Sequence, residues 1–312
     1  MTADYSMTFA NVFWCIIWNI LFIWIPGNVI FRFFNLPKES PSIHQITSYL
    51  LGYQFLYLVA YGSFLLDWDK LTYVYILFFL FVFIWKFREQ KVPIYNFLKK
   101  IQESPISHPA LFLFPFLLGS FLLLKLNQQG ILFLDPQKDY YFFKSHWDDL
   151  NQVTKILELK NSFLPKDNPL FPGEPPFDYH WLGNIVIIYW IKFLPINLLT
   201  AYYHLAPFYY YLITAAVIYF MFRLAKVSRI TSSFGTAIFC LLPTIWIFKV
   251  KLWGIAGYFP NRGMAGLFQT LCFLFFAFQF IKKRSAKYFL LTFCWAFIYV
   301  TKANILLSSS LG

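Results

Sequence analysis

Long apolar runs separated by short polar connections form the main pattern of this sequence. A helix needs roughly 20 apolar residues to cross a hydrocarbon core of about 30 Å. The pattern predicts an all-α fold, a polytopic transmembrane helical bundle of about nine spans. The predicted spans lie near residues 9–34, 46–66, 71–87, 109–126, 181–200, 205–223, 230–249, 263–281 and 287–307.

The composition favours lipid as the main solvent of the chain. It is 59% hydrophobic and 13% charged, with a mean hydropathy of +0.56, whereas soluble proteins are about 45–50% apolar and about 25% charged. The first apolar run is too long for a signal peptide and no small-residue cleavage site follows it, so we expect a retained helix. The chain ends in LLSSSLG directly after an apolar run, which predicts that it is part of a longer membrane protein.

Basic residues gather in three connections, at 86–103, 223–229 and 282–287. Cytoplasmic loops of membrane proteins carry such an excess of Lys and Arg. The net charge of +12 therefore indicates topology, and we expect no nucleic-acid partner. Two complete spans between 181 and 223 would place the 223–229 cluster outside the cytoplasm. Either the 181–200 run does not cross fully, or this cluster breaks the rule.

A long polar segment, residues 127–180, interrupts the apolar runs and lies outside by the same rule. We therefore divide the chain into N-terminal membrane helices (1–126), an external acidic loop (127–180) and C-terminal membrane helices (181–312). The loop holds eight of the 14 acidic residues: Asp135, Asp139, Asp148, Asp149, Glu158, Asp167, Glu174 and Asp178.

Two adjacent carboxylates, Asp148 and Asp149, precede an amphipathic stretch in this loop. Its apolar residues have helical spacing, which predicts a short helix on the membrane surface. They are Leu150, Val153, Ile156, Leu157 and Leu159. A stiff run rich in Pro and Gly follows, and Tyr179 and His180 then lead into the next apolar run.

The carboxylate pair allows several roles. Mg²⁺ and Mn²⁺ take oxygen ligands, so Asp148 and Asp149 are candidate metal ligands, and the metal would neutralise a phosphate leaving group. Either carboxylate could instead act as a catalytic general base toward an acceptor hydroxyl, or Asp148 could cap the helix. His180 is a candidate catalytic group that positions the substrate, with a simple interfacial hydrogen bond as the alternative.

This arrangement resembles the GT-C superfamily of integral membrane glycosyltransferases, over roughly residues 139–270. It departs from relatives that carry a His four residues after the loop aspartate, because Gln152 stands there. The resemblance implies a helical bundle, a catalytic aspartate at the non-cytoplasmic face, a polyprenyl-phosphate-linked sugar as donor, and a glycan, lipid or protein as acceptor. The matching residues are Asp148 or Asp149, then Phe163, Pro165, Asn168, Pro169, Gly173, Tyr179 and His180.

Five residues are candidate substrate contacts under this resemblance. Arg262 suits a lipid phosphate because its guanidinium presents a fork of donors, and the alternative is an anchor at a helix start. Lys302 interrupts the last apolar run, where it could pair with a phosphate or extend to the interface. Lys144 and His146 flank the aspartates and could contact the donor phosphate or remain solvated. Tyr179 belongs to the matching string.

The sequence favours a glycosyltransferase of a bacterial inner or plasma membrane, embedded in membrane lipid. One alternative is a transporter or flippase of lipid-linked glycans, which should carry charges inside its spans and repeated halves. Another is a non-catalytic membrane scaffold, which would tolerate loss of the aspartates. Mg²⁺ or Mn²⁺ is the cofactor that the carboxylate pair suggests.

Overall fold

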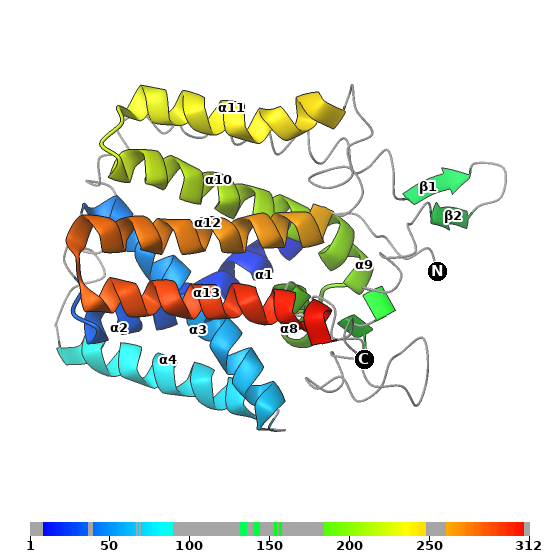
Figure 1. Cartoon of the computed structure of the whole chain (residues 1–312). Helices are drawn as coiled ribbons and strands as arrows, with labels where there is room; N and C mark the ends of the chain where they lie inside the picture. The colour runs from blue at the N-terminus through cyan, green and yellow to red at the C-terminus, as the bar shows by residue number, and fades with distance from the viewer. Residues whose placement is uncertain are drawn as a thin grey trace.

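Helices account for nearly all of the residues that the computed structural model describes (Figure 1). This confirms the predicted all-α fold. A small antiparallel hairpin, which the sequence did not predict, is formed in the acidic loop by β1 (Leu132–Asp135) and β2 (Tyr140–Phe143). The described residues are 9–36, 40–66, 68, 70–89, 132–135, 140–143, 153–154, 156–157, 184–247 and 260–308.

The N-terminal region contains one long interrupted helix followed by two others. α1 passes without a break through a π-helical turn, η1, into α2, so that the three form one rod. Pro26 lies in the first turn of α2, and it lacks the N–H that a regular α-helical turn requires. The elements are α1 (Phe9–Asn19), η1 (Ile20–Trp24), α2 (Ile25–Phe33), α3 (Pro41–Leu65) and α4 (Leu71–Glu89).

The C-terminal region contains a second π-helical turn that is followed by a helix with proline in its first turn. A π-helical turn, η3, precedes α10, and Pro207 lies in the first turn of that helix. Apart from the 181–200 run, the predicted runs that fall on described residues are helical over nearly all of their length, while the 109–126 run lies outside the described residues. The elements are α8 (Ile185–Phe193), α9 (Leu198–Thr200), η3 (Ala201–Leu205), α10 (Ala206–Leu224), α11 (Arg229–Ile247), α12 (Pro260–Lys283) and α13 (Ala286–Ser308).

The apolar run at 181–200 does not form a full span, which corrects the prediction of a span there. Its helix, α8, has nine residues, so at about 1.5 Å per residue it covers about half of a 30 Å hydrocarbon core. It ends at Leu194, whose backbone is extended, directly before Pro195. Proline restricts the preceding residue to extended conformations. The short helix agrees with the first of the two alternatives for the 223–229 cluster, a run at 181–200 that does not cross fully.

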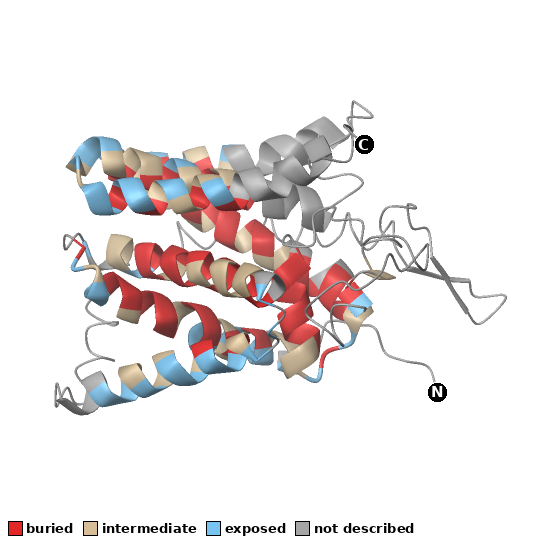
Figure 2. Cartoon of the chain, turned by 60° about the horizontal axis from the view of Figure 1, so that its bottom comes forward, coloured by how far each residue is buried: buried red, intermediate tan, exposed pale blue. Residues whose placement is uncertain are grey.

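α8 lies in the interior of the bundle. Residues 185–190 are each 0% exposed, as expected for a helix that is apolar on all sides. Trp190 packs edge-on against Trp18 of α1 and against Tyr209 of α10, with ring centroids 6.3 and 5.2 Å apart. The Tyr189 hydroxyl lies 3.0 Å from that of Thr72 in α4. Figure 2 shows buried residues concentrated in the middle of the bundle.

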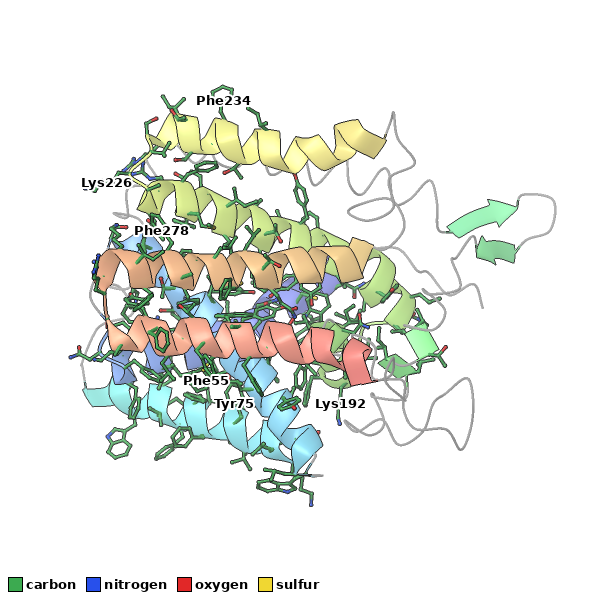
Figure 3. All side chains as sticks on the ribbon, viewed as in Figure 1. Phe55, Tyr75, Lys192, Lys226, Phe234 and Phe278 are labelled. Atoms are coloured by element: carbon green, nitrogen blue, oxygen red, sulfur yellow. The ribbon has the colours of Figure 1, made fainter. Side chains whose placement is uncertain are left out.

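The outward surfaces of α1, α4, α11, α12 and α13 are largely apolar. Large exposed side chains project from them, and Figure 3 shows Phe234 pointing away from the bundle. A soluble monomer rarely exposes an apolar surface of this extent. Examples are Phe13, Trp14, Ile16, Leu77, Phe78, Phe81, Trp85, Ile230, Phe234, Ile238, Leu274, Ile281, Phe289 and Phe293.

One helical segment in the described part of the chain, Ala10–Phe33, is long and apolar enough to cross a membrane by length and composition. Three other apolar stretches are shorter, Leu71–Trp85, Phe208–Leu224 and Ala286–Ile298. α3 is 25 residues long but carries buried polar side chains, including Thr47, Ser48 and Gln54, which lower its hydropathy. Association with a membrane is the conclusion that these lengths support.

Candidate functional site

The predicted catalytic centre lies outside the described residues. This applies to both candidate metal ligands, to the candidate positioning group and to three of the candidate substrate contacts. Their proposed roles therefore stay predictions. The residues concerned are Lys144, His146, Asp148, Asp149, Tyr179 and His180.

The two remaining candidates, Arg262 and Lys302, lie on described helical backbone. Arg262 is in the first turn of α12 and Lys302 is in the C-terminal part of α13. α12 begins, and α13 ends, at the same end of the bundle (Figure 1). The predicted helix start beside Arg262 is confirmed, and α13 continues past Lys302 to Ser308.

Four described residues belong to the predicted surface helix of the acidic loop. Val153, Thr154, Ile156 and Leu157 are all helical, which confirms the helix at these positions. Ile156 is fully buried in the hydrophobic core, whereas Leu157 is 47% exposed. Part of this stretch therefore packs on the bundle through its apolar face.

The basic connections lie at one end of the bundle. The ends of α2, α4, α10 and α12 meet there, on the left in Figure 1. Two lysines join chain segments at this end: Lys282 Nζ donates to Leu224 O at 3.3 Å, and Lys287 Nζ donates to Asn35 O at 3.4 Å. The hairpin β1–β2 of the acidic loop lies beyond the opposite end. The bundle thus separates its basic turns from the described part of its acidic loop.

A partly buried tyrosine network lies between these two ends, and it was not predicted. The Tyr49 hydroxyl in α3 donates to Asn19 Oδ1 at 2.6 Å and lies 2.5 Å from the Tyr209 hydroxyl of α10. Asn19 Nδ2 in turn donates to Cys15 O at 2.7 Å. One side-chain network therefore links α1, α3 and α10. Asn19 directly precedes η1, and η3 comes shortly before Tyr209.

Further polar groups extend this network along α3 toward α12. Tyr53 and Tyr57 follow Tyr49 at helical spacing and are 0% and 1% exposed. The Tyr57 hydroxyl lies close to Tyr210 and to the Gln269 amide, but neither it nor the Gln269 amide makes a hydrogen bond of ordinary geometry to a described residue. Each such buried group costs about 1–3 kcal/mol.

Gln54 extends the polar contacts of α3 to the last helix. Its side-chain Nε2 donates to Leu291 O of α13 at 2.8 Å. The two residues are 237 positions apart in the sequence. α3 therefore contacts α1, α10, α12 and α13 through polar or aromatic groups, and it is the central helix of the bundle.

The chemistry of this network is that of neutral hydrogen-bonding groups. Hydroxyls and amides can orient water or an uncharged polar group, whereas sites for divalent cations in proteins usually include carboxylate ligands. Within the described residues no group of three His, Cys, Asp or Glu side chains could hold a metal ion. Cys15 and Cys272 are buried free thiols, and buried cysteines of this kind pack as small apolar side chains.

The tyrosine spacing was present in the sequence. Tyr49, Tyr53 and Tyr57 recur every four residues, which places them on one face of a helix. With 21 Tyr and 41 Phe in the chain, this spacing did not stand out from the aromatic background. Comparisons with protein-family models, with curated proteins and with solved structures found no match.

Proposed function

We propose that this chain is a multi-pass membrane protein whose basic end faces the cytoplasm. The exposed apolar surfaces of α1, α4, α11, α12 and α13 support lipid contact around the bundle. The grouping of its basic turns at one end supports the orientation, because cytoplasmic connections carry excess Lys and Arg. A half-length α8 supports it as well, since the 223–229 cluster then falls on the cytoplasmic side.

Within that membrane, the protein transfers a sugar from a polyprenyl phosphate to an acceptor at the non-cytoplasmic face. The bond between the anomeric carbon and the phosphate oxygen breaks, and a bond from that carbon to the acceptor oxygen forms. The acceptor hydroxyl loses its proton to Asp148 or Asp149 acting as base. The lipid phosphate leaves with the electron pair of the broken bond.

The observation that carries this proposal is the position of the acidic loop relative to the basic turns. A lipid-phosphate donor has its reacting bond at the boundary between lipid and water. The described parts of the loop, β1–β2 and the helical residues around Ile156, belong to the end away from the basic turns. Arg262 at the start of α12 belongs to the same end, where a guanidinium suits a phosphate.

Single substitutions of the aspartates test this function. Membranes carrying the full chain receive polyprenyl phosphates bearing labelled glucose, mannose or arabinose, and transfer of label to endogenous acceptors is measured. We expect transfer with at least one donor, and a loss of about 100-fold or more in Asp148→Asn or Asp149→Asn, because a general base is worth about 10²–10⁴-fold.

Asp135→Asn is the matched control, since Asp135 ends strand β1 in the same loop. We expect it to keep near-normal transfer at equal membrane insertion. Full transfer in both Asp148→Asn and Asp149→Asn would reject the proposal. Loss of lipid-linked glycan uptake with transfer unaffected would point to a transporter instead.

A further inference from the structure

Three helices that end at the basic end finish with a residue in the left-handed backbone conformation. They are Asn35 after α2, Lys226 after α10 and Arg284 after α12, with φ of 44°, 63° and 49°. Glycine adopts this conformation most easily and asparagine tolerates it, whereas lysine and arginine are strained by their Cβ atoms. Two helix ends therefore carry a cation where glycine would be more stable.

The backbone N–H groups of both residues bond to their own helices: Lys226 N donates to Arg223 O at 3.0 Å, and Arg284 N donates to Phe280 O at 2.7 Å. At the carboxyl end of α10, Lys282 Nζ also donates to Leu224 O at 3.3 Å. The side chains of Lys226 and Arg284 are exposed. Figure 3 shows Lys226 projecting from the turn between α10 and α11.

None of the side chains that the structure describes is a carboxylate, at this end or elsewhere in the described part of the chain. Other cations surround Lys226 and Arg284. The turn between α12 and α13 is joined to the end of α10 by Lys282 and to the end of α2 by Lys287. The hydrogen bonds of these two lysines hold the turns together as one basic surface. It comprises Arg223, Lys226, Arg229, Lys282, Lys283, Arg284 and Lys287.

Apolar side chains border this basic surface directly. Ile230, Ile281 and Phe289 are 57%, 70% and 55% exposed, and each lies within a few residues of a cation in the sequence. A phospholipid presents the same pair of features, an anionic phosphate and apolar acyl chains. A free phosphate ion or a nucleic acid would leave the apolar border without a partner.

We propose that Lys226 and Arg284 bind the phosphate groups of anionic phospholipids, while Ile230, Ile281 and Phe289 contact the acyl chains. Lys226 and Arg284 occupy these positions in spite of their strained backbone, because a glycine there could not bind the lipid phosphate. This site is independent of the sugar-transfer chemistry proposed above. It is also more specific than a general preference of basic loops for the cytoplasm, because it names two residues at positions where glycine would adopt the backbone conformation more easily.

The test compares glycine and glutamine substitutions in the purified full chain. Thermal unfolding of wild type, Lys226→Gly, Arg284→Gly and the two glutamine variants is measured in neutral detergent, alone or with added phosphatidylglycerol or phosphatidylcholine. In detergent alone we expect the glycine variants to unfold at the same or a higher temperature than wild type. Glutamine keeps the strained side chain and should not raise that temperature.

With phosphatidylglycerol we expect wild type to gain more stability than with phosphatidylcholine. Each variant removes one of the two cations. It should therefore lose roughly half of the extra stability that phosphatidylglycerol gives to wild type over phosphatidylcholine. Lys70→Gln, an exposed cation before α4 at the opposite end, is the control and should keep the full difference. Retention of the full difference in both glutamine variants would overturn the proposal. An equal gain of wild type with inorganic phosphate would also overturn it, in favour of a free-anion site.

Discussion

One hydroxyl group in this bundle contacts two other helices. The Tyr49 hydroxyl lies between Asn19 of α1 and Tyr209 of α10, so three helices depend on one oxygen atom. Hydroxyls in a hydrocarbon environment have few alternative partners. Loss of such a group therefore leaves other polar atoms unpaired.

Tyr49→Phe should destabilise the protein by about 1–2 kcal/mol, because it leaves the carbonyl of Asn19 without its donor. Thermal unfolding in detergent measures the effect. Tyr73→Phe is the matched control: Tyr73 is 44% exposed on α4 and keeps its ring contact with Phe193. Equal unfolding temperatures for the two variants would contradict a structural role for the Tyr49 network.

His44 predicts a pH dependence of stability. It lies before the predicted span at 46–66, with its ring 4.2 Å from that of Phe31. Burial lowers the pKa of His44 below its usual 6.5, and the nearby Arg32 lowers it further. The unfolded chain therefore binds more protons than the folded one just below pH 6.5, so stability falls as the pH falls through this range and is constant above it.

Unfolding temperatures between about pH 8 and about pH 5 should show this decline, and His44→Gln should reduce it. The variant removes the titrating imidazole but keeps a polar side chain. An unchanged decline in His44→Gln would assign the pH dependence to other groups.

At the scale of elements, two glycines set the crossing of α2 and α3. A Cβ atom on Gly27 would lie 1.7 Å from Ser48 O, and one on Gly52 would lie 1.8 Å from Ile23 O. Both contacts are with backbone, which cannot move aside as a flexible side chain does. The two helices therefore approach each other as closely as their backbones allow.

Gly52→Ala should destabilise the protein by about 3 kcal/mol or prevent its folding, because the two helices must separate. Gly62→Ala, in the same helix, is the control. Its Cβ would meet only the flexible Leu71 side chain at 3.3 Å, so we expect little change, or a gain of up to about 1 kcal/mol from the higher helix propensity of alanine. Equal losses in both variants would contradict the close crossing.

The helices themselves could be predicted from the hydrophobic pattern, and their ends agree within a few residues. The exception, α8, shows the limit of that pattern. A long apolar run is expected both for a full span and for a short helix buried on all sides. Here Lys192, Pro195 and the side assigned to the basic 223–229 cluster indicated the break. Buried polar contacts such as Tyr49 with Tyr209 depend on how helices distant in sequence pack. No periodicity within one segment encodes that packing.

At the scale of the whole molecule, the distribution of charge defines two ends. The turns that carry Lys226 and Arg284 lie at one end, and the turn between α3 and α4 lies at the other (Figure 1). If the bundle spans a membrane, these ends lie in different compartments. The predicted external position of the acidic loop depends on this arrangement.

Cysteine labelling in intact cells tests that arrangement. In a variant with Cys15, Cys240, Cys272 and Cys294 replaced by alanine, Lys70→Cys and Ser228→Cys are introduced separately. We expect a membrane-impermeant maleimide to react with the first in intact cells, and with the second only after permeabilisation, because basic turns face the cytoplasm. Reaction of both from the same side would reject a bundle that spans the membrane between these turns.

The hydrogen bond from Gln54 to Leu291 O has a consequence for biosynthesis. At about 5–20 residues per second, the ribosome needs on the order of ten seconds to a minute to add the 237 residues that separate donor from acceptor. During that interval the amide of Gln54 lacks its final partner. The side-chain contacts of α3 can therefore be completed only after α13 has been synthesised, so an early helix of this protein finishes its packing last.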